Sequence, residues 1–140
     1  MREGGTEMTL KFRAWLKREK KMVDVKKLTF VEGKVRCVFY RTGTEDHDSD
    51  ILSSACYEGV TFKLMQSTGL KDINDKEIYE GDVIIPDGGG ASLVHWRDGA
   101  FQVGYYGDIP YVLADYKSLT VIGNIYENPE LKQELMEVIE

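Results

Sequence analysis

The sequence is poor in the residue types that build disulfide frameworks and nucleophilic sites. Its 140 residues include two cysteines, two histidines and three prolines. Two cysteines, Cys37 and Cys56, are too few for a disulfide scaffold, and neither belongs to a C-x-x-C pair. Both lie in runs that look buried, where thiols are usually inert. We therefore expect neither a disulfide scaffold nor a cysteine nucleophile.

Long apolar runs are also missing. No stretch approaches the roughly 20 uncharged apolar residues that a membrane-spanning helix requires. The first eight residues have no apolar core and no cleavage-site pattern, so they predict no signal peptide. Together with the low cysteine content, these absences predict a cytoplasmic protein.

The sequence motifs of hydrolases and of phosphate-binding loops are absent as well. No G-x-S-x-G occurs. The glycines at 88–90 lack the Lys-Ser/Thr of a phosphate loop. The neighbouring carboxylates Glu77, Glu80 and Asp82 lie in a polar stretch that we expect to face water. We therefore predict no catalytic residue, no cofactor and no enzyme activity.

The acidic loop at 41–50 resembles a metal site at first glance. Asp46, Asp48 and Asp50 alternate like the opening ligands of a calcium loop. However, Ile51 stands where such a loop has its glycine, and Tyr57 stands where it has its closing glutamate. We therefore predict an exposed loop that binds no metal.

The charge is divided unevenly along the chain. The formal net charge is −6, yet residues 1–27 carry nine basic and four acidic side chains, and the other residues carry nine basic and twenty acidic ones. An acidic body disfavours a general coat of bound DNA because it repels phosphates. The basic segment can contact nucleic acid, or it can pair with the acidic part of its own chain or of a neighbouring subunit.

Alternating patterns predict strands in the N-terminal half. Apolar and polar side chains alternate from Thr9 to Lys17, which favours a half-buried strand, with a short helix as the competing interpretation. A second short strand is expected at 22–25. The runs 28–31 and 35–40 predict a hairpin in which Gly33 supplies the positive φ of the turn.

Further strands are expected after the acidic loop. The segment 51–57 fits a strand or a short helix equally well. A strand from Val60 to Gln66 is expected to end in a turn at 67–69, before a polar loop at 71–76. Five short strands are expected after Gly81, and antiparallel strands of this number can close into a small barrel.

The chain is expected to end in an amphipathic helix. Asn128 suits the N-cap, and Pro129 suits the first helical position. Leu131, Leu135 and Ile139 then recur every four residues and form an apolar stripe. A lone helix of this length is marginal in water, so we expect it to pack on the body of the protein rather than on a partner.

Several segments resemble the YopX proteins of bacteriophages and prophages. The opening similarity is KFRAW at 11–15, followed by Lys21-Met22. The longest is LMQSTGLKDINDKEIYEGD at 64–82, and the closing similarities are VHW at 94–96 and VIGNIYENPEL at 121–131. The sequence departs from the family pattern at Leu16, Ser67 and Asp75. The departures at Ser67 and Asp75 can change turn geometry.

Taken with the strand pattern, the resemblance implies an α+β, mainly β protein. Residues 1–76 would form antiparallel hairpins with little helix, and residues 77–140 an SH3-like small barrel with the terminal amphipathic helix. The resemblance also implies a phage or prophage gene that works in the cytoplasm of a bacterial host. It supplies no catalytic residue and no cofactor.

These observations favour a non-catalytic protein-binding or assembly module that forms a homo-oligomer or contacts a phage or host protein. The alternative is an accessory nucleic-acid-binding factor that uses the basic N-terminal segment. Tyrosines gather late in the chain, and exposed tyrosines supply contact area at low entropic cost. The candidate interaction surface comprises eight residues: Arg13, Trp15, Arg18, Lys21, Tyr105, Tyr106, Tyr111 and Tyr116.

Overall fold

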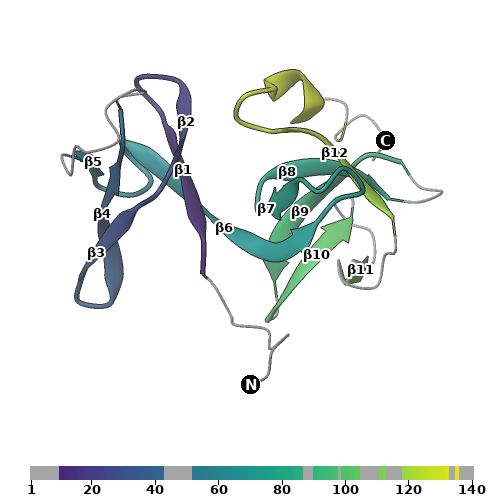
Figure 1. Cartoon of the computed structure of the whole chain (residues 1–140), viewed down its shortest axis with the longest axis horizontal. Helices are drawn as coiled ribbons and strands as arrows, with labels where there is room; N and C mark the ends of the chain where they lie inside the picture. Colours follow the sequence, from purple (N-terminus) through teal and green to yellow (C-terminus); the bar gives the residue numbers. More distant parts are fainter. Residues whose placement is uncertain are drawn as a thin grey trace. The chain divides into compact units, whose positions relative to one another are not determined.

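A computed structural model describes residues 10–42, 52–86, 90–97, 99–104, 111–112, 118–132 and 135 (Figure 1). Most of this part of the chain is β-strand, and its helical residues are 129–132 and 135. No helix in it is long and apolar enough to cross a membrane. The strands are β1 (Phe12–Leu16), β2 (Lys21–Asp24), β3 (Lys27–Val31), β4 (Lys34–Tyr40), β5 (Ser53–Cys56), β6 (Phe62–Lys71), β7 (Glu77–Tyr79), β8 (Asp82–Pro86), β9 (Ser92–Arg97), β10 (Ala100–Gly104), β11 (Tyr111–Val112) and β12 (Leu119–Asn124).

The strands form three antiparallel sheets, and the chain divides into two compact units. The sheet orders are β2-β1-β6-β7, β3-β4-β5 and β11-β10-β9-β8-β12. The first unit spans Phe12–Met65, and the second joins Met1–Lys11 to Gln66–Glu140. Strand β6 therefore contributes residues to both units. The division predicted from the sequence, 1–76 and 77–140, stays a prediction.

The first unit confirms the strands and the hairpin expected in the N-terminal half. β1 pairs with β2 from Arg13↔Asp24 to Leu16↔Lys21, so the strand interpretation of this segment is correct and the helix interpretation is wrong. β3 and β4 form the predicted hairpin. Its two turn residues, Glu32 and Gly33, have φ of +52° and +81°, as the tight turns of β-hairpins require.

A compact apolar core holds the first unit together. The segment 51–57, for which the sequence allowed a strand or a short helix, contains strand β5, which pairs with β4. Burying one large apolar side chain such as Phe62 stabilises the fold by roughly 1.5–3 kcal/mol. The buried core residues come from β1, β2, β4 and β6: Ala14, Leu16, Val23, Val38, Tyr40 and Phe62.

The second unit contains the five strands expected after Gly81. They form one antiparallel sheet that curls into a half-barrel, with β11 and β12 at its two ends. The core of this unit takes side chains from the sheet and from β7. These core residues are Ile78, Ile84, Val94, Val103 and Leu119.

The turn predicted at 67–69 is wrong, because β6 runs through it to Lys71. Gly69 has φ +82°, and the pairing register with β7 shifts between Ser67 and Lys71. The glycine therefore marks a β-bulge within a strand rather than the end of one. Thr68 fixes this bulge, since its Oγ1 donates to the Ile78 carbonyl at 2.8 Å and accepts from the Leu70 N–H at 3.1 Å.

The turn after β6 is organised by the carboxylate of Asp72, which is only 7% exposed. Its Oδ1 accepts hydrogen bonds from the N–H groups of Asn74 and Lys76, both at 2.8 Å. Its Oδ2 accepts from the N–H of Val121 in β12 at 2.9 Å. One side chain therefore closes the 72–76 turn and ties it to the half-barrel.

Asp82 was expected to face water, and this expectation is wrong. The residue is 1% exposed at the start of β8, and its Oδ2 accepts a hydrogen bond from the Tyr79 N–H at 2.8 Å. The neighbouring Glu80 accepts from the Gln66 N–H at 2.8 Å through Oε1. Asp82 therefore holds the backbone of the β7–β8 turn, in which Gly81 has φ +88°, and Glu80 joins this turn to β6.

The start of the C-terminal helix matches the prediction. Residues 129–132 are helical, and the carbonyl of Asn128 accepts from the Leu131 N–H at 2.9 Å. Leu131 lies against Gly123 of β12, where an added Cβ would come within 2.8 Å of Leu131 Cδ1. The helix therefore packs on its own unit, as expected, and Leu135 is 8% exposed. Ile139 lies outside the described residues.

The contacts of Asp72 predict an acid-sensitive contribution to stability. Burial raises the pKa of Asp72, but the N–H donors of Val121, Lys76 and Asn74 and the charge of Lys76 together outweigh burial, so the pKa is lowered. A lowered carboxyl pKa stabilises the fold above the unfolded pKa, which is about 3.9, and this contribution is lost as the pH falls through the folded value.

We expect Asp72→Asn to lower the free energy of unfolding at neutral pH by about 1–3 kcal/mol, because the amide NH₂ faces an N–H donor that it cannot satisfy. Urea denaturation between pH 7 and pH 3 measures this loss, and the variant should lose less stability on acidification than the wild type. Asp75→Asn is the matched control, since Asp75 is exposed, has φ +66° and makes a surface ion pair with Lys71. Equal stability of the two variants would contradict this role of Asp72.

Candidate functional site

The eight residues of the predicted interaction surface differ widely in exposure. Arg13 is 8% exposed and Trp15 is half-buried, whereas Arg18 and Lys21 are exposed beside the β1–β2 turn. Tyr111 belongs to β11. The other three tyrosines, Tyr105, Tyr106 and Tyr116, lie outside the described residues. Arg13 therefore offers little surface to a partner.

The described part of the first unit exposes more cations than anions. In its described part, ten exposed lysines and arginines face solvent together with four exposed carboxylates. Four of these cations sit in and beside one turn, which we call the basic turn: Lys17, Arg18, Lys20 and Lys21. A surface with this excess of cations attracts anionic partners.

The basic turn lies against the turn between β5 and β6. The N–H of Lys17 donates to the Thr61 carbonyl at 3.0 Å, and its Nζ donates to the Gly59 carbonyl. The two turns are thereby held side by side. Glu58 and Thr61 are exposed in the second turn, together with two large side chains, Tyr57 at 56% and Val60 at 73% exposure.

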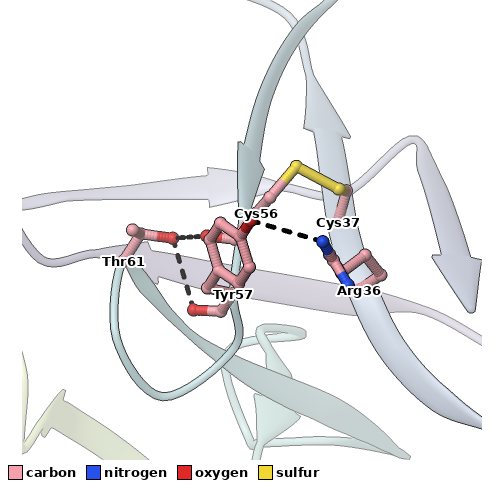
Figure 2. Close-up of a disulfide and its surroundings, with 5 residues drawn as sticks. All are labelled: Arg36, Cys37, Cys56, Tyr57 and Thr61. Carbon is pink, nitrogen blue, oxygen red and sulfur yellow. Dashed lines mark hydrogen bonds between the residues drawn. A yellow bond between two sulfur atoms is a disulfide. The ribbon is translucent and has the colours of Figure 1, made fainter. Parts of the chain in front are cut away.

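Tyr57 is paired with Arg36 at this end of the unit (Figure 2). The Arg36 guanidinium lies over the tyrosine ring at 4.6 Å from its centroid, and its Nη2 donates to the Tyr57 hydroxyl at 3.3 Å. Arg36 is the extra residue of a β-bulge, because the register of β3 against β4 passes from Thr29↔Cys37 to Phe30↔Val35. Bulges re-aim side chains, and this one supplies the cation beside the ring.

The backbone of Tyr57 is in the left-handed region, with φ +76°. A bulky residue rarely adopts this conformation, which costs roughly 1–3 kcal/mol and persists only where the surrounding contacts impose it. Here the Tyr57 N–H donates to the Arg36 carbonyl at 2.9 Å, and the Tyr57 carbonyl accepts from the N–H groups of Val60 and Thr61, both at 3.0 Å. The Thr61 hydroxyl donates to the Cys56 carbonyl (Figure 2).

A disulfide between Cys37 and Cys56 fastens the base of this corner (Figure 2). The two residues are directly opposite each other in β4 and β5. Arg36 precedes Cys37, and Tyr57 follows Cys56. Both cysteines are half-buried. The expectation of buried, inert thiols is therefore wrong. Cross-strand pairing of the β4 and β5 segments brings the sulfurs together, and the sequence left the second segment undecided.

Sequence reasoning also missed Tyr57 and Arg36 as a pair. They are 21 positions apart, and neither a bulge at an arginine nor a positive φ at a tyrosine has a recognisable signal in one sequence. We call the surface formed by Arg36, Tyr57 and the basic turn the basic–aromatic corner. Among the described residues, no group of three or more His, Cys, Asp or Glu side chains is arranged to hold a metal ion. The Asp46–Asp50 loop lies outside them.

The disulfide is expected to stabilise the first unit substantially. It joins positions separated by 19 residues, and closing a loop of that size in the unfolded chain contributes about 3 kcal/mol. Replacing both cysteines by serine should lower the free energy of unfolding by about this amount in urea denaturation. A reductant should cause a similar loss in the wild type and none in the double variant. Wild-type stability that does not respond to reductant would contradict the prediction.

Comparison with known proteins relates this structure to one family. The model of a family described as YopX protein matches residues 11–133. A solved structure, the crystal structure of protein EF1440 from Enterococcus faecalis, is similar with a TM-score of 0.65 and 28% sequence identity, over 89% of this chain and 99% of that chain. No curated protein matches the chain.

Proposed function

The chain belongs to the YopX family, and we propose that it is a non-catalytic binding module that contacts the phosphates of nucleic acid through its first unit. The observation that carries this proposal is the exposed charge of the described part of that unit. Its described residues expose ten basic and four acidic side chains, a net of +6. Phosphate backbones bind such surfaces through the release of counterions.

Exposed aromatic side chains lie within the same unit and add to this argument. Besides Tyr57, Phe30 in the β3–β4 hairpin is 60% exposed. Proteins that bind single strands combine cations along the backbone path with aromatic rings on which bases stack. The first unit has both kinds of side chain on its surface.

The polar residues of the family motif support a non-catalytic role. Asp72 and Asp82 are buried and accept hydrogen bonds from backbone N–H groups. The Asn124 side chain likewise accepts from the N–H groups of Tyr126 and Glu127, at 3.0 and 2.8 Å. Their hydrogen-bonding groups are thus used to fix turns of the second unit, which is a structural role.

The setting of this function is part of the proposal. From the family resemblance we infer a phage or prophage gene whose product works in the cytoplasm of a bacterial host. The assignment of the five-stranded half-barrel to the SH3-like class belongs to the same inference. In this setting the second unit acts as the scaffold, and the first unit carries the contact surface.

We expect a fluorescently labelled oligonucleotide to bind the protein at about 50 mM salt and to dissociate steeply as salt rises. Arg18→Gln with Lys21→Gln should weaken binding and make the log–log salt slope shallower by about 1.4, the value for two phosphate contacts on a single strand. Fluorescence anisotropy over a salt series measures both effects. Lys71→Gln with Lys132→Gln, two exposed lysines of the second unit, is the control and should bind like the wild type. Absence of binding at low salt would end the proposal.

A second candidate function is self-assembly through opposite charges. Counted over the sequence, the first unit carries eleven basic and eight acidic side chains, a net of +3. The second carries seven basic and sixteen acidic ones, a net of −9. The basic unit of one copy can therefore attract the acidic unit of another.

Self-assembly predicts a mass above that of the monomer at low salt and micromolar concentration, falling to the monomer as salt screens the charges. Sedimentation equilibrium without nucleic acid measures this mass. The Arg18→Gln, Lys21→Gln variant should dissociate at lower salt than the wild type. If the protein is a monomer under all of these conditions, opposite charges do not drive its self-assembly.

A further inference from the structure

The described part of the first unit has a strained, exposed tyrosine that directly follows a disulfide-bonded cysteine. Tyr57 has φ +76° and is 56% exposed. Glycine and asparagine adopt this φ with little or no strain, whereas a bulky aromatic residue rarely does. The position instead carries a large ring that the core of the unit does not use.

The surroundings of the ring have the chemistry of a stacking site. The Arg36 guanidinium lies over the ring at 4.6 Å from its centroid and leaves more than half of the residue open to solvent. The basic turn is joined to the same corner through the contacts of Lys17 with Thr61 and Gly59. An aromatic ring beside fixed cations is the arrangement that holds one base and its flanking phosphates.

We propose that an unpaired nucleic-acid base stacks on Tyr57, and that the Cys37–Cys56 disulfide holds the ring in position for it. This inference rests on the proposed nucleic-acid function. It adds the binding site, the preference for single strands and the redox control of binding. Arg36 and the basic turn bind the phosphates on either side of the stacked base. A duplex offers no free base face to the ring, so the site selects single strands.

The disulfide makes this site dependent on the redox state. A dithiol reductant delivers two electrons and two protons to the cystine, so the bond between the sulfurs of Cys37 and Cys56 breaks, two thiols form and the reductant leaves as its own disulfide. In the dithiol form, β5 is held to β4 by backbone pairing, by the packing of Ala55 against the core and by the Arg36–Tyr57 contacts, without the covalent link. The positive φ of Tyr57 then loses a constraint, and the ring spends less time in the stacking position.

Two substitutions at one position separate the ring from the backbone. Tyr57→Asn removes the ring but tolerates the positive φ, so the turn is retained. Tyr57→Phe keeps the ring and removes only the hydroxyl that Arg36 contacts. Circular dichroism and thermal unfolding of both variants check that the fold persists.

The experiment measures anisotropy of a labelled oligothymidine and of a duplex of equal length, at one low salt concentration. We expect the wild type to prefer the single strand, Tyr57→Phe to bind within about twofold of it, and Tyr57→Asn to bind at least about fivefold more weakly. Dithiothreitol, applied at a temperature where circular dichroism shows the reduced protein still folded, should weaken the wild type towards Tyr57→Asn. It should change Tyr57→Asn little.

The outcomes distinguish this inference from the function on which it rests. Salt-dependent binding in which Tyr57→Asn equals the wild type, or in which duplex and single strand bind equally, would overturn the stacking site and leave phosphate binding standing. Reduced, folded wild type that binds as tightly as the oxidised protein would overturn the role of the disulfide. No binding by any form at low salt would remove the proposed function itself.

Discussion

The pairing of β4 with β5 is the interaction on which the surface of the first unit depends. It places Cys37 opposite Cys56, and the disulfide then fixes the chain on either side of each cysteine. Arg36 precedes one cysteine and Tyr57 follows the other, so the covalent link and the Tyr57 N–H to Arg36 carbonyl bond hold both ends of the pair. A tyrosine at positive φ is unfavourable alone, and the cross-strand contact with Arg36 stabilises it.

The second unit is organised by short polar side chains that bond to nearby backbone. Asp72 joins its own turn to β12, and Asp82 holds the β7–β8 turn. At the other end of β12, the Asn124 side chain caps the turn at 125–127, and the backbone N–H of Asn124 donates to Asn128 Oδ1 at 3.2 Å. An added Cβ at Gly123 would lie 2.5 Å from that same oxygen, so a larger residue would displace the Asn128 side chain. The polar residues and glycines of the family motifs therefore fix turns and allow close packing of the backbone against side chains.

Much of the fold could be predicted because its signals are local. The hairpin at Gly33, the strand pattern after Gly81 and the start of the helix at Asn128 each depend on neighbouring residues. The prediction failed where a distant partner decides the outcome. Gly69 reads as a turn, but pairing with β7 makes it a bulge, and closure of the five strands into a barrel depends on edges that the sequence pattern does not specify.

The candidate site was less predictable for the same reason. Arg18 and Lys21 were identified because charge runs are visible in sequence, and Arg13 was included although β1 buries it. Alternation along a strand indicates two faces, but it does not say whether another element covers the second one. The Arg36–Tyr57 pair depends on a bulge, a positive φ and a disulfide, and each of these follows from the register of β4 with its neighbours rather than from local composition.

The proposed cytoplasmic setting favours reduced cysteines, whereas the structure contains an oxidised pair. Cytoplasmic thiol systems keep cysteines reduced, whereas the pairing of β4 and β5 brings the two sulfurs within bonding distance. The first unit has 54 residues, a size at which burial of apolar surface leaves a small margin of stability. A covalent contribution of about 3 kcal/mol is a large fraction of such a margin. Reduction of the disulfide therefore lowers the stability of this unit first, and through it the order of the corner that carries the exposed tyrosine.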